Sequence, residues 1–227
     1  MFEEYRDRLK QAGNTNQEAV ISSSKRQAIN SITKSATKSN ILMGQKPDDM
    51  KDTTCIGSDV DTYKMRRFLF FPDTLVYKGD YIVENGLYYL ITNLTFNEIY
   101  PQGFAEHCNE TFDFVVGEEK IKTGVDKSGR PIYEIKKIIE TYPCVLSNKV
   151  YSEADNSPVP LPDGAMIIKV PYFRDDKLIP DINRSISHHG DQFKIVNVNY
   201  DNVMKYRDGL EHGHLEVQLQ REPVGTQ

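Results

Sequence analysis

The feature that most constrains the fold is the segment from Asp80 to Ile91, which reads DYIVENGLYYLI. Two runs rich in aromatic and branched residues flank Asn85-Gly86, the dipeptide that best tolerates the positive φ angles of a type I′ turn. The segment therefore predicts a tight β-hairpin. Short runs of the same kind continue beyond it, so we expect a mainly β protein.

The first forty residues have a different character. From Gln17 onward, apolar residues lie seven (Ile21–Ala28), four (Ala28–Ile32), three (Ile29–Ile32) and four (Ile32–Ala36) positions apart, which is the spacing of one helix face. Residues 1–40 carry seven cations and four anions, a balance of +3, which leaves −5 − 3 = −8 for the remaining chain. A narrow apolar stripe on a polar helix suits docking against a partner. A locally packed N-terminal arm is the open alternative.

The candidate partner-contacting residues combine this apolar stripe, the cations beside it and two acidic positions further on. They are Ile21, Lys25, Arg26, Ile29, Ile32, Lys34, Lys38, Asp59 and Asp61. For the two acidic positions, an ordinary solvated loop is the alternative interpretation.

Turn formers and prolines divide the chain. Residues 44–64 hold five Asp and little apolar periodicity, which predicts a long acidic loop. Three prolines within 152–164 predict a stiff extended linker, because proline lacks the N–H that a strand ladder needs. The expected organisation is an N-terminal helical arm at 1–43, the acidic loop at 44–64, a first β module at 65–151, the linker at 152–164 and a second β module at 165–227.

The two expected modules share an internal echo. Residues 86–99 align without a gap to residues 190–203, an offset of 104 positions. Either one barrel-like or sandwich-like β module is duplicated, or two half-buried strands after a turn look alike. The expected core residues are Phe68, Phe70, Tyr81, Leu90, Ile91, Phe112, Phe114, Ile168, Ile195 and Val198.

Composition narrows the function classes. The chain has 28 Lys and Arg against 33 Asp and Glu, a net charge of −5 that disfavours a general nucleic-acid coat. Three cysteines are too few for a disulfide framework. No apolar run approaches the length of a membrane span, and MFEEYRDRLK lacks the apolar core of a secretory signal. We therefore expect synthesis in a reducing cytoplasm.

Catalytic motifs are weak. The common phosphate-binding loops, the nucleophile elbow and HExxH are absent from the sequence. Asp73 with Glu134-x-Lys136, or with Glu118-x-Lys120, fits the loose pattern of a Mg²⁺-dependent nuclease. Because 27% of the residues are charged, such triplets arise easily. The prediction is a protein with no catalysis and no cofactor.

Two histidine pairs, His188-His189 and His212-x-His214, could in principle supply four imidazoles to a metal ion. Gly213 and the nearby Gly209 suggest a turn, and no cysteine lies near. The prediction is that these are solvated loop histidines and that no metal binds.

Three sequence motifs, taken in their order along the chain, resemble those of a known family. The first is the helical start MFEEYRDRLKQAGNTNQEAVISSSKRQAINSITKS, and the second is KGDYI followed by NG and YLI at 78–91. The third is EIYPQG at 98–103 followed by HCN at 107–109. In this order they resemble a family of minor structural proteins of tailed bacteriophages of Gram-positive hosts, namely head–tail connector, neck or head-completion proteins. The resemblance covers roughly residues 1–150.

The resemblance implies a structural virion protein that forms a homo-oligomeric ring of about 12 or 6 copies around the DNA channel. A portal or adaptor protein would lie on one side and a tail-side neck protein on the other, with double-stranded DNA passing through without sequence-specific binding. An acidic body would let DNA slide, and a cationic arm could dock on an acidic portal or adaptor surface. A tail terminator or baseplate component and a Mg²⁺-dependent nuclease are the other hypotheses.

Overall fold

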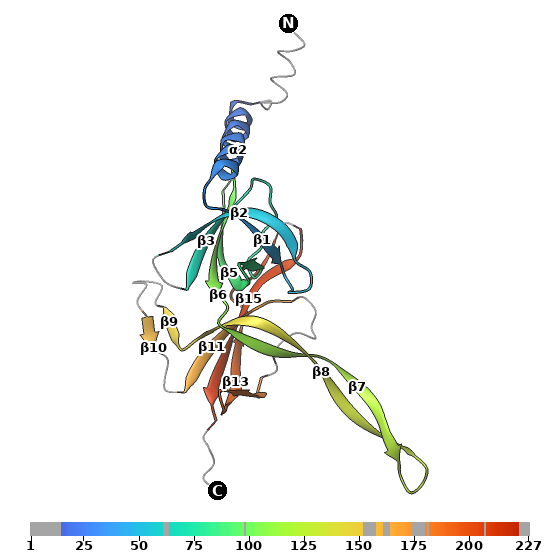
Figure 1. Ribbon diagram of the computed structural model, residues 1–227. Coiled ribbons are helices and arrows are strands. Elements are labelled where there is room, and N and C mark those ends of the chain that lie inside the picture. The colour runs from blue at the N-terminus through green and yellow to red at the C-terminus, as the bar shows by residue number, and fades with distance from the viewer. Residues whose placement is uncertain are drawn as a thin grey trace. The chain divides into compact units, whose positions relative to one another are not determined.

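A computed structural model of the chain describes residues 15–60, 64–97, 99–151, 158–160, 164–173, 180, 182–206 and 208–222. The chain divides into two compact units, Met1–His107 and Cys108–Gln227. Antiparallel strands build most of both units, and within the described residues one helix precedes them (Figure 1). This confirms the expected class, mainly β with an N-terminal helix and two β modules.

Helix α2 (Asn16–Lys34) opens the described part of the first unit. The Thr15 hydroxyl accepts from the Glu18 N–H, and the Glu18 carboxylate accepts from the Thr15 N–H, each at 3.2 Å. This reciprocal capping box satisfies donors that a helix start leaves free. The helical spacing from Gln17 is thus confirmed. The expected arm at 1–43 is too long, because its last residues already belong to a strand.

The first unit is a closed barrel with the strand order β1-β2-β3-β6-β5-β4, and β4 pairs back with β1. Closure leaves this sheet without an edge. Its strands are β1 (Lys38–Gly44), β2 (Lys51–Asp59), β3 (Met65–Phe70), β4 (Tyr81–Glu84), β5 (Leu87–Phe96) and β6 (Pro101–His107). Asn85 and Gly86, with φ of 53° and 78°, make the predicted tight turn between β4 and β5.

The prediction of a loop over 44–64 is wrong for its second half. Strand β2 lies there and pairs with both β1 and β3. Only Cys55 and Gly57 of this strand are fully buried. Because most of its other residues are polar, the sequence does not show the alternation of apolar and polar residues that is typical of a strand. Residues 61–63 lie outside the described part of the chain.

The barrel core is apolar and aromatic. Phe68 and Tyr89 meet edge to face with ring centroids 5.9 Å apart. Burial, followed by the charge of Glu84, raises the pKa of the Cys55 thiol to about 12, so this cysteine is an inert core residue. The expected core residues of this unit are all buried, namely Phe68, Phe70, Tyr81, Leu90 and Ile91.

The second unit is a sheet with the strand order β12-β13-β15-β11-β8-β7, and β14 adds to β15. Its strands are β7 (Glu110–Val125), β8 (Pro131–Ser147), β11 (Ala165–Pro171), β12 (Ser185–His188), β13 (Asp191–Asn199), β14 (Val203–Lys205) and β15 (Glu211–Arg221). Strands β9 (Lys149–Tyr151) and β10 (Pro158–Pro160) form a separate pair. Phe112, Phe114, Ile168 and Ile195 are buried as expected, and Val198 is half-buried.

The unit boundary lies between His107 and Cys108, so its prediction at 152–164 is wrong. Strand β8 precedes that segment and β11 follows it, yet the two strands pair directly, with Leu146 opposite Ile168. Because β8 and β11 are neighbours in the same sheet, the segment that joins them lies within one unit. Residues 152–157 and 161–163 lie outside the described residues.

The second sheet repeats the strand order of the barrel. Strands β1, β2, β3, β6, β5 and β4 correspond in turn to β7, β8, β11, β15, β13 and β12. The offset of 104 holds in detail, because both sheets have a register shift directly after the isoleucine at 91 or 195. The Gly79 N–H donates to the Ile91 carbonyl and the Asn183 N–H to the Ile195 carbonyl, each at 2.8 Å. These equivalences support duplication of one module.

The two sheets differ in how their first and last strands in the strand order are joined. In the barrel, β1 and β4 form a ladder from Leu42–Gly44 to Tyr81–Val83. The corresponding strands β7 and β12 are the two edges of the second sheet, and side chains bridge them instead. Arg184 Nη1 donates to the Asp113 carbonyl at 3.1 Å, and His188 Nδ1 lies 3.1 Å from Glu110 Oε2. We call this gap between β7 and β12 the seam.

Candidate functional site

The most conspicuous element of the second unit is the hairpin of β7 and β8. Its strands stay paired from Glu110–Cys144 out to Val125–Pro131. At the tip, the Asp126 carboxylate accepts from the N–H groups of Ser128 and Arg130 at 2.7 and 2.8 Å, and Gly129 takes a φ of 78°. The turn formers of GVDKSGR at 124–130 predict the tip of a hairpin that joins a strand at 118–123 to one at 132–139, and the structure extends this hairpin at its base.

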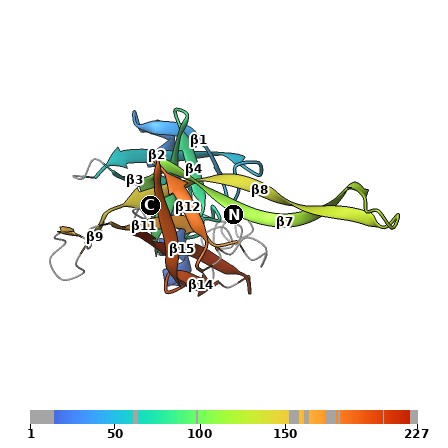
Figure 2. The same ribbon diagram turned by 90° about the horizontal axis from the view of Figure 1, so that it is seen from below.

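The outer part of this hairpin is a two-stranded ribbon. β11 pairs with β8 only at Val145–Ser147, and within the described residues no further strand is bonded to the ribbon beyond that point. Figures 1 and 2 both show the two strands running on together past the rest of their sheet. An isolated two-stranded ribbon is at best marginally stable in water. We call residues 117–139 the ribbon.

The ribbon exposes large apolar side chains. Tyr133 is 57% exposed and Ile135 is 55% exposed, both on one face, whereas Ile132 and Ile138 lie on the other. The exposed apolar residues of the ribbon are Ile121, Val125, Ile132, Tyr133, Ile135, Ile138 and Ile139. Such a concentration on an unsupported ribbon is typical of a surface that another molecule covers.

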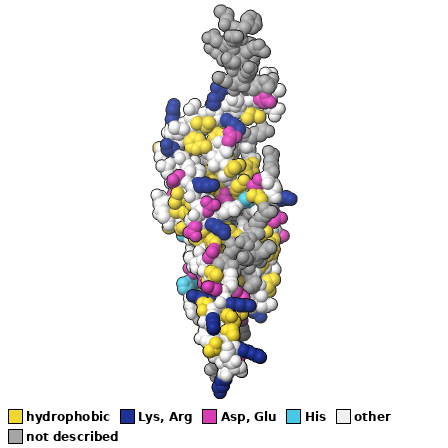
Figure 3. Space-filling model, turned by 90° about the vertical axis from the view of Figure 1, so that its right-hand side faces the viewer, with side chains coloured by type: hydrophobic (Ala, Val, Ile, Leu, Met, Phe, Trp, Pro, Cys, Tyr) yellow, Lys and Arg dark blue, Asp and Glu magenta, His cyan; other side chains and the backbone are white. Residues whose placement is uncertain are grey.

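The ribbon also concentrates positive charge. The whole ribbon has six Lys or Arg and four Asp or Glu, a balance of +2. Its outer residues 120–137 have six and two, a balance of +4, which leaves −5 − 4 = −9 for the rest of the chain. Nearer the base, Glu118 and Glu119 lie directly opposite Lys137 and Lys136, an arrangement that supports the strand register. On the face seen in Figure 3, cations, anions and hydrophobic side chains are intermingled.

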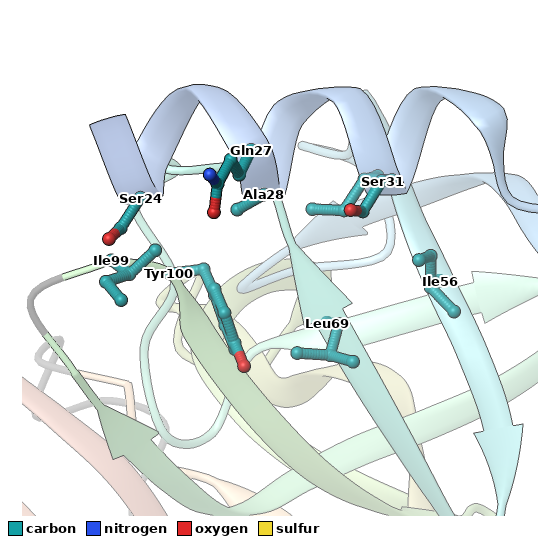
Figure 4. A pocket seen from close by; sticks show the side chains of 9 residues that line it. Ser24, Gln27, Ala28, Ser31, Ile56, Leu69, Ile99 and Tyr100 are labelled. Carbon is teal, nitrogen blue, oxygen red and sulfur yellow. The ribbon is translucent and has the colours of Figure 1, made fainter. Parts of the chain in front are cut away.

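A second candidate surface lies between α2 and the barrel. A groove of about 370 Å³ separates them, and Figure 4 shows helix side chains facing barrel side chains across it. Its lining is mostly small, polar or aliphatic, with Tyr100 as the aromatic member. The lining residues are Ser24, Gln27, Ala28, Ser31, Ile32, Ile56, Leu69, Ile99 and Tyr100.

The sequence-predicted interface residues have different environments. Lys25 pairs with Asp73 at 2.6 Å, Asp59 pairs with Arg66 at 3.2 Å, and Ile32 is buried. Lys25 and Asp59 therefore have ion-pair partners within their own unit, and Ile32 is buried within it. Arg26, Ile29, Lys34 and Lys38 are exposed and Ile21 is half-buried, whereas Asp61 lies outside the described residues.

The residues of the nuclease hypothesis are divided between the two units. Asp73 is in the first unit and is paired with Lys25. Glu118, Lys120, Glu134 and Lys136 belong to the ribbon of the second unit. Within the part of the chain that the structure describes, the group of three potential metal ligands that comes together contains none of these residues.

That group consists of Glu110, His188 and His189, whose ligand atoms all lie within 4.8 Å of one another. The prediction for the other histidine pair is wrong, because His212 and His214 are buried on strand β15 and not solvated in a turn. Gly213 between them allows a close backbone approach, since a Cβ there would lie 2.2 Å from the Asn202 carbonyl oxygen. The sequence pattern missed Glu110, which is 78 positions from His188.

Comparison with known proteins relates the chain to a phage-derived class. The family model described as "YomX C-terminal domain" matches residues 110–217, which lie inside the second structural unit. A curated relative is the "SPbeta prophage-derived uncharacterized protein YomX" of Bacillus subtilis (strain 168), 29% identical over 147 residues. The match covers 63% of this chain and 64% of that protein. No solved structure matches the chain.

Both similarities support a phage origin for the chain. Among the described residues, no helix has the length and apolar character that crossing a bilayer requires.

Proposed function

We propose that the chain is a structural virion protein of a bacteriophage neck. In this role, identical copies form a ring between the DNA-filled head and the tail, and DNA passes through the ring without sequence-specific binding. The observation that carries the proposal is the ribbon, an exposed element with apolar side chains and a cationic outer part, which no other described strand supports. The similarity to a prophage-derived protein supports the phage context.

The ribbon's partner in this proposal is a second copy of the same chain. A ribbon segment with a charge of +4 on a chain whose remainder carries −9 favours contact with the next copy. Because the ribbon of one copy would contact a different part of the next copy, the contact is heterologous, and such contacts close into rings when the rotation permits. Burying Tyr133 and Ile135 in this contact supplies apolar area that the single chain leaves in water.

The remaining acidic surface suits a DNA channel, since like charge keeps the duplex from adhering. The exposed cations of α2 and β1 are the proposed contact to an acidic portal or adaptor surface, with Arg26, Lys34 and Lys38 as its basic residues. A tail-side neck protein would bind the opposite face of the ring. The protein acts by shape in this proposal and lowers no chemical barrier.

The ribbon can be tested without disturbing the sheet below it. Replacing residues 118–137 with Asn-Gly would join Gly117 to Ile138, which are already opposite each other, through a tight turn. Native mass spectrometry should find a ring for the wild type and a monomer for this variant, with the circular dichroism of the sheet retained. Leu75→Lys, an exposed apolar position in the first unit, is the control and should still form rings. Rings of the shortened variant would overturn the proposed contact.

The neck assignment is tested in the virus itself. A phage lacking this chain should produce DNA-filled heads that carry no tails, and purified wild-type virions should contain the chain in a ring's copy number. Tails of abnormal length or with defective tips would instead assign the chain to a terminator or baseplate. Normal infectious particles without the chain would contradict a structural role altogether.

A further inference from the structure

A cluster of three metal-binding side chains lies at the seam of the second sheet. Glu110 is the first residue of β7, His188 is the last residue of β12, and His189 follows in the turn to β13. Their ligand atoms lie within 4.8 Å of one another, and His188 Nδ1 and Glu110 Oε2 are 3.1 Å apart. Two imidazoles and a carboxylate form a donor set that suits zinc and similar first-row metals.

We infer that Glu110, His188 and His189 bind one Zn²⁺ ion, which fastens β7 to the β12–β13 turn across the seam. Ligand atoms of a tetrahedral zinc ion lie about 3.3 Å apart, since each is about 2.0–2.1 Å from the metal. The Glu110–His188 pair already has this spacing, and the third ligand reaches it by a small side-chain movement. Three protein ligands leave a fourth position for water.

The position of the cluster gives the ion a structural task. In the barrel, the equivalent strands β1 and β4 are joined by a backbone ladder. At the seam, the described residues are bridged by the Arg184 bond to the Asp113 carbonyl and by the His188–Glu110 pair. An ion bound to both edges would hold them together in place of the missing ladder. It would also fix the base of the hairpin, because Glu110 begins the strand that continues into the ribbon.

The turn residue His189 supports this inference. It takes a φ of 50° and is followed by Gly190 at 89°, which repeats Asn85 and Gly86 of the barrel at the same offset of 104. Asn-Gly, which the barrel has here, is among the dipeptides that type I′ turns favour most, whereas His-Gly is not. The second unit therefore has the conformationally less suitable residue at the position where an imidazole meets Glu110 and His188.

The turn geometry suggests a variant that removes one ligand and retains the fold. His189→Asn removes one ligand and installs the residue that the barrel uses in its own turn, so the fold is retained. His107→Gln removes a histidine of the first unit and leaves the cluster intact, which makes it the matched control. The untagged full-length protein is stripped with a chelator and titrated with ZnCl₂ by calorimetry, and separately with CoCl₂ to record the visible absorption bands of the bound metal.

The wild type and His107→Gln should bind one Zn²⁺ per chain, show cobalt bands and gain thermal stability with the metal. His189→Asn should bind at least about tenfold more weakly and lose the cobalt bands, while its metal-free melting temperature equals or exceeds that of the wild type. Glu110→Gln should also lose the bands. Equal binding by wild type and His189→Asn would overturn the inference, as would a metal that links two chains, detected as a rise in mass on adding zinc.

Discussion

Among the described carboxylates, that of Asp80 has the environment that departs most from the ordinary one. It is 4% exposed, its Oδ2 accepts from the Tyr77 N–H at 2.9 Å, and its Oδ1 has no hydrogen-bond partner among the described residues. Burial raises the pKa of this carboxyl from 3.8 to about 7, against the opposing effect of the Tyr77 bond. Because the folded-state value is the higher one, the folded barrel is favoured below about pH 4 and loses that advantage as the pH rises to about 7.

Asp80→Asn should therefore stabilise the barrel in a pH-dependent way. The amide oxygen can still accept from the Tyr77 N–H, and no charge is buried. At about pH 8 the free energy of unfolding should exceed that of the wild type by about 2–4 kcal/mol, and the gain should vanish near pH 4. Urea unfolding of the first unit across this range measures the difference. A pH-independent effect would show that Asp80 is not the group responsible.

Gly213 has a role that only the fold explains. A Cβ at this position would lie 2.2 Å from the Asn202 carbonyl oxygen and 2.7 Å from the Val203 Cα, both backbone atoms that cannot turn away. Gly213→Ala should lower the free energy of unfolding of the second unit by about 3 kcal/mol or more. Gly124→Ala is the control, since its Cβ would meet nothing within 4 Å, and its effect should stay within about 0.5 kcal/mol. Denaturant unfolding of both variants measures the contrast.

At the scale of elements, one side chain does most to dock α2 on the barrel. Ile32 is the buried residue of the helix, whereas Ile29, nearly one turn earlier, is 41% exposed. Ile32→Ala should weaken docking by about 2–4 kcal/mol, because it removes buried methylene groups from a site with few other apolar contacts. Hydrogen exchange should then accelerate in α2 and stay slow in β5. Ile29→Ala should leave the exchange of α2 unchanged, and similar acceleration in both variants would contradict this docking role.

Elements with strong local signals were predictable, and those with weak ones were not. Asn85-Gly86 specifies its turn through backbone conformation alone, so the β4–β5 hairpin follows from the sequence. Strand β2 was missed because its inward positions are Cys55 and Gly57 and its outward positions resemble a polar loop. The length of β7 and β8 was underestimated, since a ribbon with apolar residues on both faces has no clean period of two.

At the scale of the whole molecule, the two units should fold independently. Fragments 1–107 and 108–227 each keep a complete set of strands, so each should show cooperative thermal unfolding when expressed alone. A fragment that starts at 165 loses β8, the neighbour of β11, and should remain unfolded by circular dichroism. If that shorter fragment folded and 108–227 did not, the unit boundary would be misplaced.

Long-range proximity explains why the boundary and the ligand group were beyond sequence reasoning. Three prolines near 158 mark a stiff segment, but the pairing of Leu146 with Ile168 across it depends on tertiary structure. His188-His189 could be singled out as a pair, yet nothing local connects it to Glu110, which strand order alone brings near. The offset of 104, by contrast, was visible in the sequence because repeated strands keep their side-chain types.

The unequal closure of the two sheets has an evolutionary consequence. In the barrel, β1 and β2 are held at 7 and 9 residues, because β1 must bond a neighbour on each side. Their counterparts β7 and β8 have 16 and 17 residues, and β7 has no second backbone neighbour among the described strands. A gene that carries the module twice can conserve one copy as a rigid scaffold and let the other lengthen freely. Selection could then shape that longer finger for new contacts without risking the scaffold.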